Sequence, residues 1–189
     1  MDVNKARELV KSILSTSRYD HTIRVADTAE QLAKKYDVSQ EKAVLAAILH
    51  DYAKCFPTDE LKRLITYYQL PQQLLQFNKE LWHGPVGAMI VQDKYGVTDQ
   101  EILNAIYYHT TARENMGKLE KIIFIADYIE PGRSFPGVEE VREKVQINLD
   151  LAIQMALRNT IIYLLNKSVT IFPDTFYAYN AFMKNWEGD

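Results

Sequence analysis

The histidines and two acidic residues of this sequence have the types and spacing that suit metal chemistry. The chain has four histidines: His21, His50, His83 and His109. Asp51 follows the second of these directly, and Asp127 ends the apolar run 122–126. In an apolar core a bare carboxylate is costly unless a metal or a hydrogen-bond donor meets it. Histidine nitrogen and carboxylate oxygen suit iron, manganese and zinc in sites that keep positions open for water or substrate. We therefore expect one buried site that binds metal and phosphate.

Other polar residues near these positions suit phosphate binding. Arg133 lies between two Pro-Gly pairs, and a guanidinium held there is well placed for a bidentate phosphate contact. Thr110 and Thr111 follow the fourth histidine and can add hydrogen bonds. Lys54 comes three residues after Asp51, about one helical turn along the same face. Its ammonium group can neutralise Asp51 or contact phosphate.

Helices are the elements expected to position these residues. Apolar residues recur at helical spacing, and no alternating strand pattern occurs. We expect helices over residues 2–16, 21–36, 39–53, 61–68, 86–94, 99–109, 119–129 and 150–166. Ser39 and Thr98 are expected to be N-caps, and His21 is expected to open its helix. Gly84-Pro85 is expected to interrupt the chain just after His83. The pattern predicts an all-α protein, a compact helical bundle.

The composition limits the class of protein further. The 189 residues are enough for one domain with a sizeable core. A net charge of −3 argues against a general nucleic-acid binder but permits a small anionic substrate. Cys55 is the only cysteine, so no internal disulfide forms and a reduced, cytoplasmic setting is expected. We find no signal core and no apolar run approaching the roughly 18–20 residues of a membrane span.

Several motifs, taken in order, carry a family resemblance. They are Arg18–His21, His50–Lys54, Glu80–His83, Tyr108–Thr111, Ala126–Arg133, Phe135–Val138 and Phe172–Phe176. The order H, HD and D resembles the HD superfamily of metal-dependent phosphohydrolases. The full set is similar to the bacterial HD-type symmetrical bis(5'-nucleosyl)-tetraphosphatases. A lone HD dipeptide is a weak signal, whereas the ordered set is specific and covers nearly the whole chain.

The resemblance implies an HD domain and roles for individual residues. The implied metal ligands are His21, His50, Asp51 and Asp127. The implied metal is iron, as one ion or two, and manganese or cobalt can substitute. The catalytic candidates are Asp51, Lys54, His83 and His109. The substrate-binding candidates are Arg18, Glu80, His83, His109, Thr111, Arg133, Thr170, Asp174 and Thr175.

The activity implied is that of a hydrolase acting on acid anhydrides. A metal-activated water would cleave diadenosine tetraphosphate symmetrically into two ADP. An HD nucleotidase acting on mononucleotides or guanosine alarmones is an alternative, and a nucleotide-binding sensor without turnover is another. We expect one HD domain over residues 1–189, with the aromatic segment 166–189 packed on it. That segment is compatible with a homodimer. The oligomeric state, the physiological metal and the adenine or guanine preference stay open. No nucleic-acid polymer or membrane partner is expected.

Overall fold

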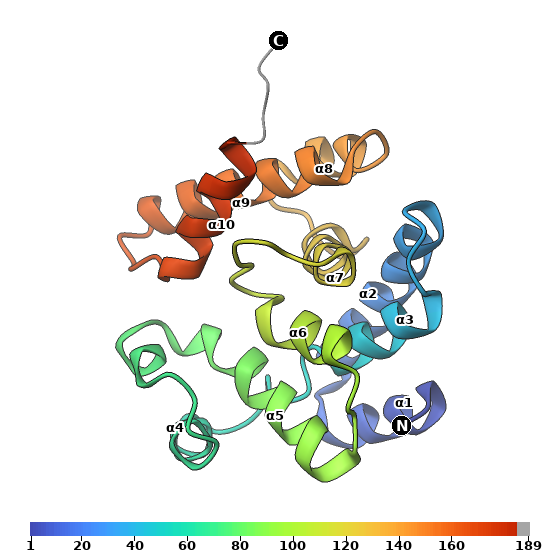
Figure 1. Ribbon diagram of the computed structural model, residues 1–189, viewed down its shortest axis with the longest axis vertical. Coiled ribbons are helices and arrows are strands. Elements are labelled where there is room, and N and C mark those ends of the chain that lie inside the picture. Colours follow the sequence, from blue (N-terminus) through green and yellow to red (C-terminus); the bar gives the residue numbers. More distant parts are fainter. Residues whose placement is uncertain (185–189) are drawn as a thin grey trace.

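The computed structural model describes residues 1–184, and these form ten α-helices and two short 3-10 helices without any strand (Figure 1). The all-α prediction is thus confirmed. The elements are α1 (Val3–Ile13), α2 (Thr16–Lys35), α3 (Gln40–Leu49), α4 (Thr58–Tyr67), η1 (Gln72–Gln76), η2 (Lys79–Leu81), α5 (His83–Tyr95), α6 (Gln100–Tyr108), α7 (Lys118–Ile129), α8 (Val138–Lys144), α9 (Leu149–Asn166) and α10 (Pro173–Lys184). In this part of the chain no helix is long and apolar enough to cross a membrane.

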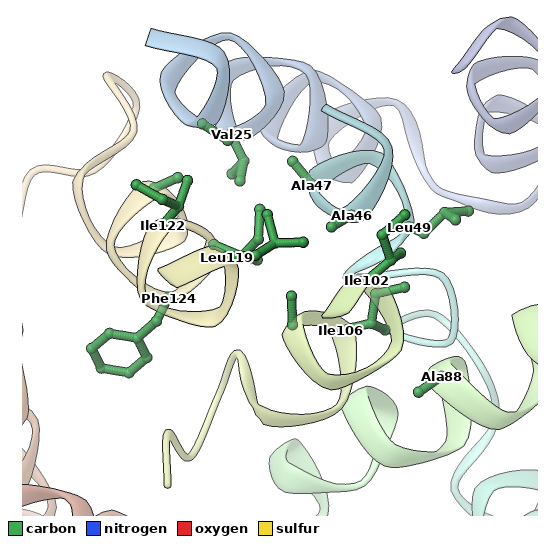
Figure 2. Close-up of a cluster of buried hydrophobic side chains, with 14 of the residues drawn as sticks. Val25, Ala46, Ala47, Leu49, Ala88, Ile102, Ile106, Leu119, Ile122 and Phe124 are labelled. Atoms are coloured by element: carbon green, nitrogen blue, oxygen red, sulfur yellow. The ribbon is translucent and has the colours of Figure 1, made fainter. Parts of the chain in front are cut away.

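Helix α7 is the central element of the bundle. It contacts α2, α3, α6, α8 and α9, and Figure 1 shows it nearly end-on between α9 and α6. Ile122, Ile123 and Ile125 are completely buried, as expected for a helix that is apolar on almost every side. Figure 2 shows Ile122 within the apolar cluster, whereas the ring of Phe124 points away from it. The helix ends as predicted at Ile129, because the residue before a proline avoids helical geometry and Glu130 is extended.

The predicted caps were correct at one helix and wrong at another. Ser39 caps α3, and its hydroxyl accepts a hydrogen bond from the amide of Lys42. Thr98 does not cap α6. The cap is Asp99, whose Oδ1 accepts from the amides of Glu101 at 2.9 Å and Ile102 at 3.4 Å. A carboxylate also meets the positive end of the helix favourably, which a hydroxyl cannot do to the same extent.

The first correction to a helix boundary concerns His21. It does not open α2, because the helix begins at Thr16 after the N-cap Ser15, whose hydroxyl accepts from the Arg18 amide at 3.4 Å. His21 therefore lies within α2 rather than at its start, and its side chain is buried. The local polar run 15–18 concealed this start, since it lacks apolar periodicity but supplies a good cap.

Two further boundaries differ from the prediction and bear on the site. Helix α3 ends at Leu49 rather than near residue 53, and the backbone amide of Tyr52 donates to the Leu49 carbonyl at 3.0 Å in a tight turn. His50 and Asp51 therefore lie at a helix end. Gly84 and Pro85 do not interrupt the chain, because α5 begins at His83 and includes both. A proline in the first turn lacks only an N–H that would have no partner within the helix.

The C-terminal helix α10 packs on α9 at one end of the molecule (Figure 1). Phe172, Tyr179 and Phe182 pack against the core, whereas Phe176 and Tyr177 are exposed. Residues 185–189, the end of the predicted aromatic segment, lie outside the described residues.

Candidate metal and phosphate site

The predicted site residues come from segments far apart in the sequence and meet beside α7. His21 comes from α2, and the pair His50 and Asp51 from the end of α3. His83 begins α5, and His109 follows the last residue of α6. Asp127 lies on α7. All four histidines and Asp51 are buried, so the fold places them in one low-dielectric cluster.

One oxygen of Asp51 faces the first group of ligand candidates. Its Oδ2 lies 3.4 Å from His50 Nε2 and 3.7 Å from His21 Nε2. On the far side of this group, His21 Nε2 lies 3.1 Å from Asp127 Oδ1. The nitrogens of His21 and His50 and an oxygen of Asp127 lie within 4.8 Å of one another, close enough for one ion to join them.

The other oxygen of Asp51 faces the second pair of histidines. Its Oδ1 lies 3.0 Å from His83 Nε2 and 3.8 Å from His109 Nε2, and these two nitrogens are 2.9 Å apart. Gly84 makes this approach feasible, because a Cβ there would lie 2.9 Å from the Tyr107 carbonyl oxygen. Any larger residue would push α5 away from α6 and separate the two imidazoles.

The imidazole rings are oriented by hydrogen bonds on their outer sides. His50 Nδ1 donates to the Ala47 carbonyl at 2.5 Å, and His109 Nδ1 donates to the Ile106 carbonyl at 2.7 Å. His21 Nδ1 meets Glu130 Oε1 at 3.1 Å. Each contact leaves Nε2 directed at the cluster, the arrangement by which proteins orient metal-binding histidines.

Glu130 contacts the ligand candidate His21 and Arg24 contacts Glu130, and we did not predict either residue from the sequence. Glu130 is almost fully buried, and its carboxylate also accepts from Arg24 Nε at 2.5 Å and from the Gly132 amide at 2.6 Å. The sequence feature that could have indicated a buried carboxylate is the position of Glu130 directly after an apolar helix.

Charges within the cluster set its protonation. Burial disfavours the charged form of Asp51, but His50 and His83 outweigh it and hold the pKa of Asp51 well below its usual range. Burial also opposes ionisation of Asp127, whose pKa is nevertheless lowered by His21, His50 and Arg133. For His109, burial and then the neighbouring His83 and His50 lower the pKa to about 3. A neutral imidazole between ionised carboxylates is the form that binds a metal.

The residues present fit a divalent metal ion. Within residues 1–184, the Nε2 atoms of His21 and His50 are buried without a hydrogen-bond partner, a state that a cation would relieve. A second set of ligand atoms within 4.8 Å comes from His50, Asp51 and His109. The four predicted metal ligands are thus brought together, and His109 joins them.

A cavity of about 390 Å³ opens over this cluster. Its polar lining contains the predicted Arg18, Lys54, Glu80 and Arg133. Arg18 Nη1 donates to Asp51 Oδ2 at 2.9 Å, and Arg133 Nη2 donates to Asp127 Oδ1 at 2.6 Å. Lys54 Nζ lies 2.9 Å from Glu80 Oε2. Cations therefore surround the carboxylates, as an anionic substrate requires.

Four of the predicted substrate-binding residues do not line the cavity, namely Thr111, Thr170, Asp174 and Thr175. Thr110 lines the cavity in place of Thr111. Thr111 is buried and its hydroxyl donates to the Ala112 carbonyl, while Thr175 Oγ1 donates to the Thr111 carbonyl at 2.8 Å. The last bond links α10 to the segment after His109. The roles of these residues stay predictions.

The cavity lining also contains aromatic residues that we did not predict. They are Phe124, Tyr128, Phe135 and Tyr163, together with Thr160. Helical spacing was the available signal, since Tyr163 follows Thr160 by three residues and Tyr128 follows Phe124 by four.

Comparison with known proteins places this fold and site in a class. Residues 18–132, more than half of the chain, match the HD domain family model. The protein is therefore an HD-domain protein, and hydrolases of this class depend on metal ions held by clusters of this kind.

Full-length relatives make the assignment more specific. The chain is 47% identical over 180 residues to the symmetrical bis(5'-nucleosyl)-tetraphosphatase of Bacillus subtilis, covering 95% of this chain and 97% of that protein. It is 49% identical over 183 residues to the protein of the same name from Halalkalibacterium halodurans, covering 97% and 98% of the two chains. The chain belongs to the family of these symmetrical tetraphosphatases.

A solved structure agrees with this placement. The crystal structure described as a predicted HD superfamily hydrolase involved in NAD metabolism, from Clostridium acetobutylicum, has a TM-score of 0.93 at 37% identity. The match covers 98% of this chain and 99% of that chain. The helical arrangement is therefore shared along nearly the full length.

Proposed function

We propose that this protein is a metal-dependent hydrolase that cleaves dinucleoside tetraphosphates symmetrically, converting diadenosine tetraphosphate and water into two ADP. The relatives named for this reaction match almost the entire chain. The observation that carries the proposal is the position of Asp51. Its two oxygens face two separate histidine groups at the floor of a cation-lined cavity.

The geometry suggests what each side chain does. The residues that would hold the metal are His21, His50, Asp51 and Asp127, together with His109. A bound divalent ion supplies a water nucleophile at neutral pH and charge stabilisation for the phosphoryl oxygens. Arg18 and Arg133 already pair with the cluster carboxylates and lie where phosphate oxygens would enter.

Lys54 and His83 also belong to the polar lining of the cavity. Lys54 is held by Glu80, so Glu80 positions a cation rather than contacting the anion itself. The lysine stabilises negative charge on the departing nucleoside diphosphate. Burial and the neighbouring His83 and His50 lower the pKa of His109 to about 3, and its neutral form would serve as a metal ligand.

We propose iron as the metal, as one ion or two, because an oxygen of Asp51 faces each of the two groups of donors that would hold it. The two overlapping ligand sets share His50 and consist of nitrogen and carboxylate oxygen, which suits iron and permits manganese or cobalt. We also propose that the chain is one HD domain with the segment after residue 166 packed on it. The contact between α10 and α9 supports this arrangement.

The test is product analysis with purified protein. Diadenosine tetraphosphate is incubated with iron or manganese, with and without a chelator, and the products are separated by ion-exchange chromatography. ADP alone, lost on chelation, is the expected result. ATP with AMP would contradict symmetrical cleavage. Nucleotide binding without turnover in any of these metals would favour the sensor, and turnover of mononucleotides or guanosine alarmones alone would favour the nucleotidase.

A further inference from the structure

The cavity over the metal cluster has two chemically different sides. Arginine, lysine, histidine and carboxylate groups line its floor and the side formed by residues 51–54, η2 and the start of α5. The aromatic side of the cavity, as we define it, consists of Phe124 and Tyr128 from α7, Phe135, and Tyr163 from α9, together with Thr160.

The aromatic side chains of this side are held by the core or by one another, and two of them keep exposed surface. Phe124 is a buried member of the core whose ring is directed away from the other labelled side chains (Figure 2), and it lines the cavity. The rings of Tyr128 and Phe135 meet edge to face at 5.0 Å between their centroids. Phe135 keeps 37% and Tyr163 keeps 60% of its surface exposed. Aromatic surface that is gathered along a cavity and left exposed is typical of ligand-binding grooves.

We infer that this aromatic side is a nucleobase subsite, in which Tyr163 stacks on the base of one nucleoside of the substrate. The inference rests on the proposed function, because a base reaches this side only when its phosphates lie on the cationic floor. Stacking between a base and an aromatic ring is a common mode of nucleotide recognition that tolerates different bases.

The arrangement along the chain supports one bound unit reaching both sides. Arg133, which touches Asp127 on the floor, is two residues from Phe135 on the aromatic side. Tyr128 likewise follows Asp127 directly on α7. Phosphate-binding and base-binding groups are thus adjacent, as a nucleoside polyphosphate needs.

An interface between two copies of the chain is the competing role for Tyr163. Ile162 and Leu165 on the same helix are also exposed, and the Lys167 ammonium lies 5.9 Å from the Tyr163 ring. Tyr163 differs from those two apolar residues because it lines the cavity, whereas they do not.

The experiment compares a probe with a base and a probe without one. Binding of ADP and of pyrophosphate to manganese-loaded protein is measured by calorimetry for the wild type, Tyr163→Ala and Tyr163→Phe. Tyr67→Ala is the matched control, since Tyr67 is 65% exposed on α4 and lies outside the cavity lining. Circular dichroism checks the fold of each variant.

We expect Tyr163→Ala to weaken ADP binding roughly ten-fold and to leave pyrophosphate binding unchanged, as loss of one stacking contact predicts. Tyr163→Phe keeps the ring and should bind ADP like the wild type, as should Tyr67→Ala. Unchanged ADP affinity in Tyr163→Ala would overturn the subsite. An equal loss for both probes, or a change of oligomeric state in size-exclusion chromatography with ADP binding intact, would do the same.

Hydrolysis of diadenosine tetraphosphate by the wild type, run in parallel, separates the two proposals. Turnover to ADP combined with ADP binding independent of Tyr163 would reject only the subsite. ADP binding that depends on Tyr163, without ADP formation from the dinucleotide, would reject the proposed reaction and leave the subsite as a mononucleotide site.

Discussion

Asp51 is the residue on which the cluster depends most. It is buried, its oxygens face different histidines, and Arg18 donates to one of them. Without this carboxylate, the imidazoles and the Arg18 guanidinium would lie close together without the negative charge that stabilises them. A metal would lose the ligand that both sets of donors surround.

We therefore predict that Asp51→Ala abolishes metal binding and hydrolysis while the fold persists. The residue follows the last turn of α3 rather than filling the apolar core, so helix packing does not depend on it. Bound metal is measured by elemental analysis after dialysis, and activity by ADP release. Full activity in this variant would show that the site has been placed wrongly.

Glu130 gives a second prediction at this scale, with a defined pH dependence. Burial opposes its ionisation, but Arg24, the Gly132 amide and His21 lower its pKa from 4.5 to about 2. Because the folded-state pKa is depressed, the stabilisation is complete above about pH 4.5 and is lost as the pH falls toward 2.

Glu130→Gln should therefore lower the free energy of unfolding by about 2 kcal/mol at pH 7, the order expected for a charged hydrogen bond. The difference from the wild type should shrink as the pH is lowered below 4.5. Urea unfolding in the presence of a chelator measures this without a contribution from metal. A difference that stays constant from pH 7 down to pH 3 would argue against the charge as its origin.

At the scale of elements, the segment between α7 and α8 is held by a residue outside the cavity lining. Arg142 on α8 donates through Nε to the Ile129 carbonyl at 2.9 Å. Its Nη2 donates to the carbonyls of Glu130 at 2.8 Å and Arg133 at 2.9 Å. One guanidinium thus anchors the segment that carries both Glu130 and Arg133.

We predict that Arg142→Ala lowers the free energy of unfolding by about 1–3 kcal/mol. It should also raise KM several-fold with a smaller change in kcat, because Arg133 is displaced while the metal ligands are not. Combining it with Arg133→Ala should give less than the sum of the two effects on KM. Additive effects would show that Arg142 only stabilises the fold.

A control variant and a conservative variant test whether the effect of Arg142→Ala is specific to the guanidinium of Arg142. Arg63 makes an exposed ion pair with Glu60, so Arg63→Ala should change stability by less than about 1 kcal/mol and leave KM unaltered. Arg142→Lys should not restore the wild-type KM, since an ammonium group cannot span three carbonyls as a guanidinium does.

At the scale of the whole molecule, the metal cluster joins parts of the chain that are otherwise connected only by packing. Its members come from α2, the end of α3, the start of α5, the end of α6 and α7. The unfolded chain holds no such arrangement. Metal binding should therefore stabilise the native state as a whole.

We predict that removing metal lowers the unfolding midpoint. Free metal at about 100 times its Kd should add about 2.7 kcal/mol of stability. Thermal unfolding followed by circular dichroism, with manganese titrated into metal-free protein, measures the shift. Asp51→Ala is the control and should show no dependence on manganese. Equal shifts in both proteins would indicate binding elsewhere.

The sequence determined the helical class and most of the cluster, because apolar periodicity and short motifs are local properties. The apolar run before Asp127 predicted the central helix over residues 119–129, and α7 does end at Ile129. The motifs around His50 and His109 predicted residues that do come together. Local signals were weaker at helix starts, where Asp99 rather than Thr98 is the cap and α2 begins before His21.

Only the tertiary structure decided which side chains share the cavity. Glu130 contacts His21 across 109 positions of the sequence, so no local pattern pairs them. The close approach permitted by Gly84, and the aromatic side containing Tyr163, depend on how α5 packs on α6 and how α9 packs on α7. The sequence by itself determined which residues can bind metal. Their distances and the shape of the cavity around them were decided by helix packing, which no single segment specifies.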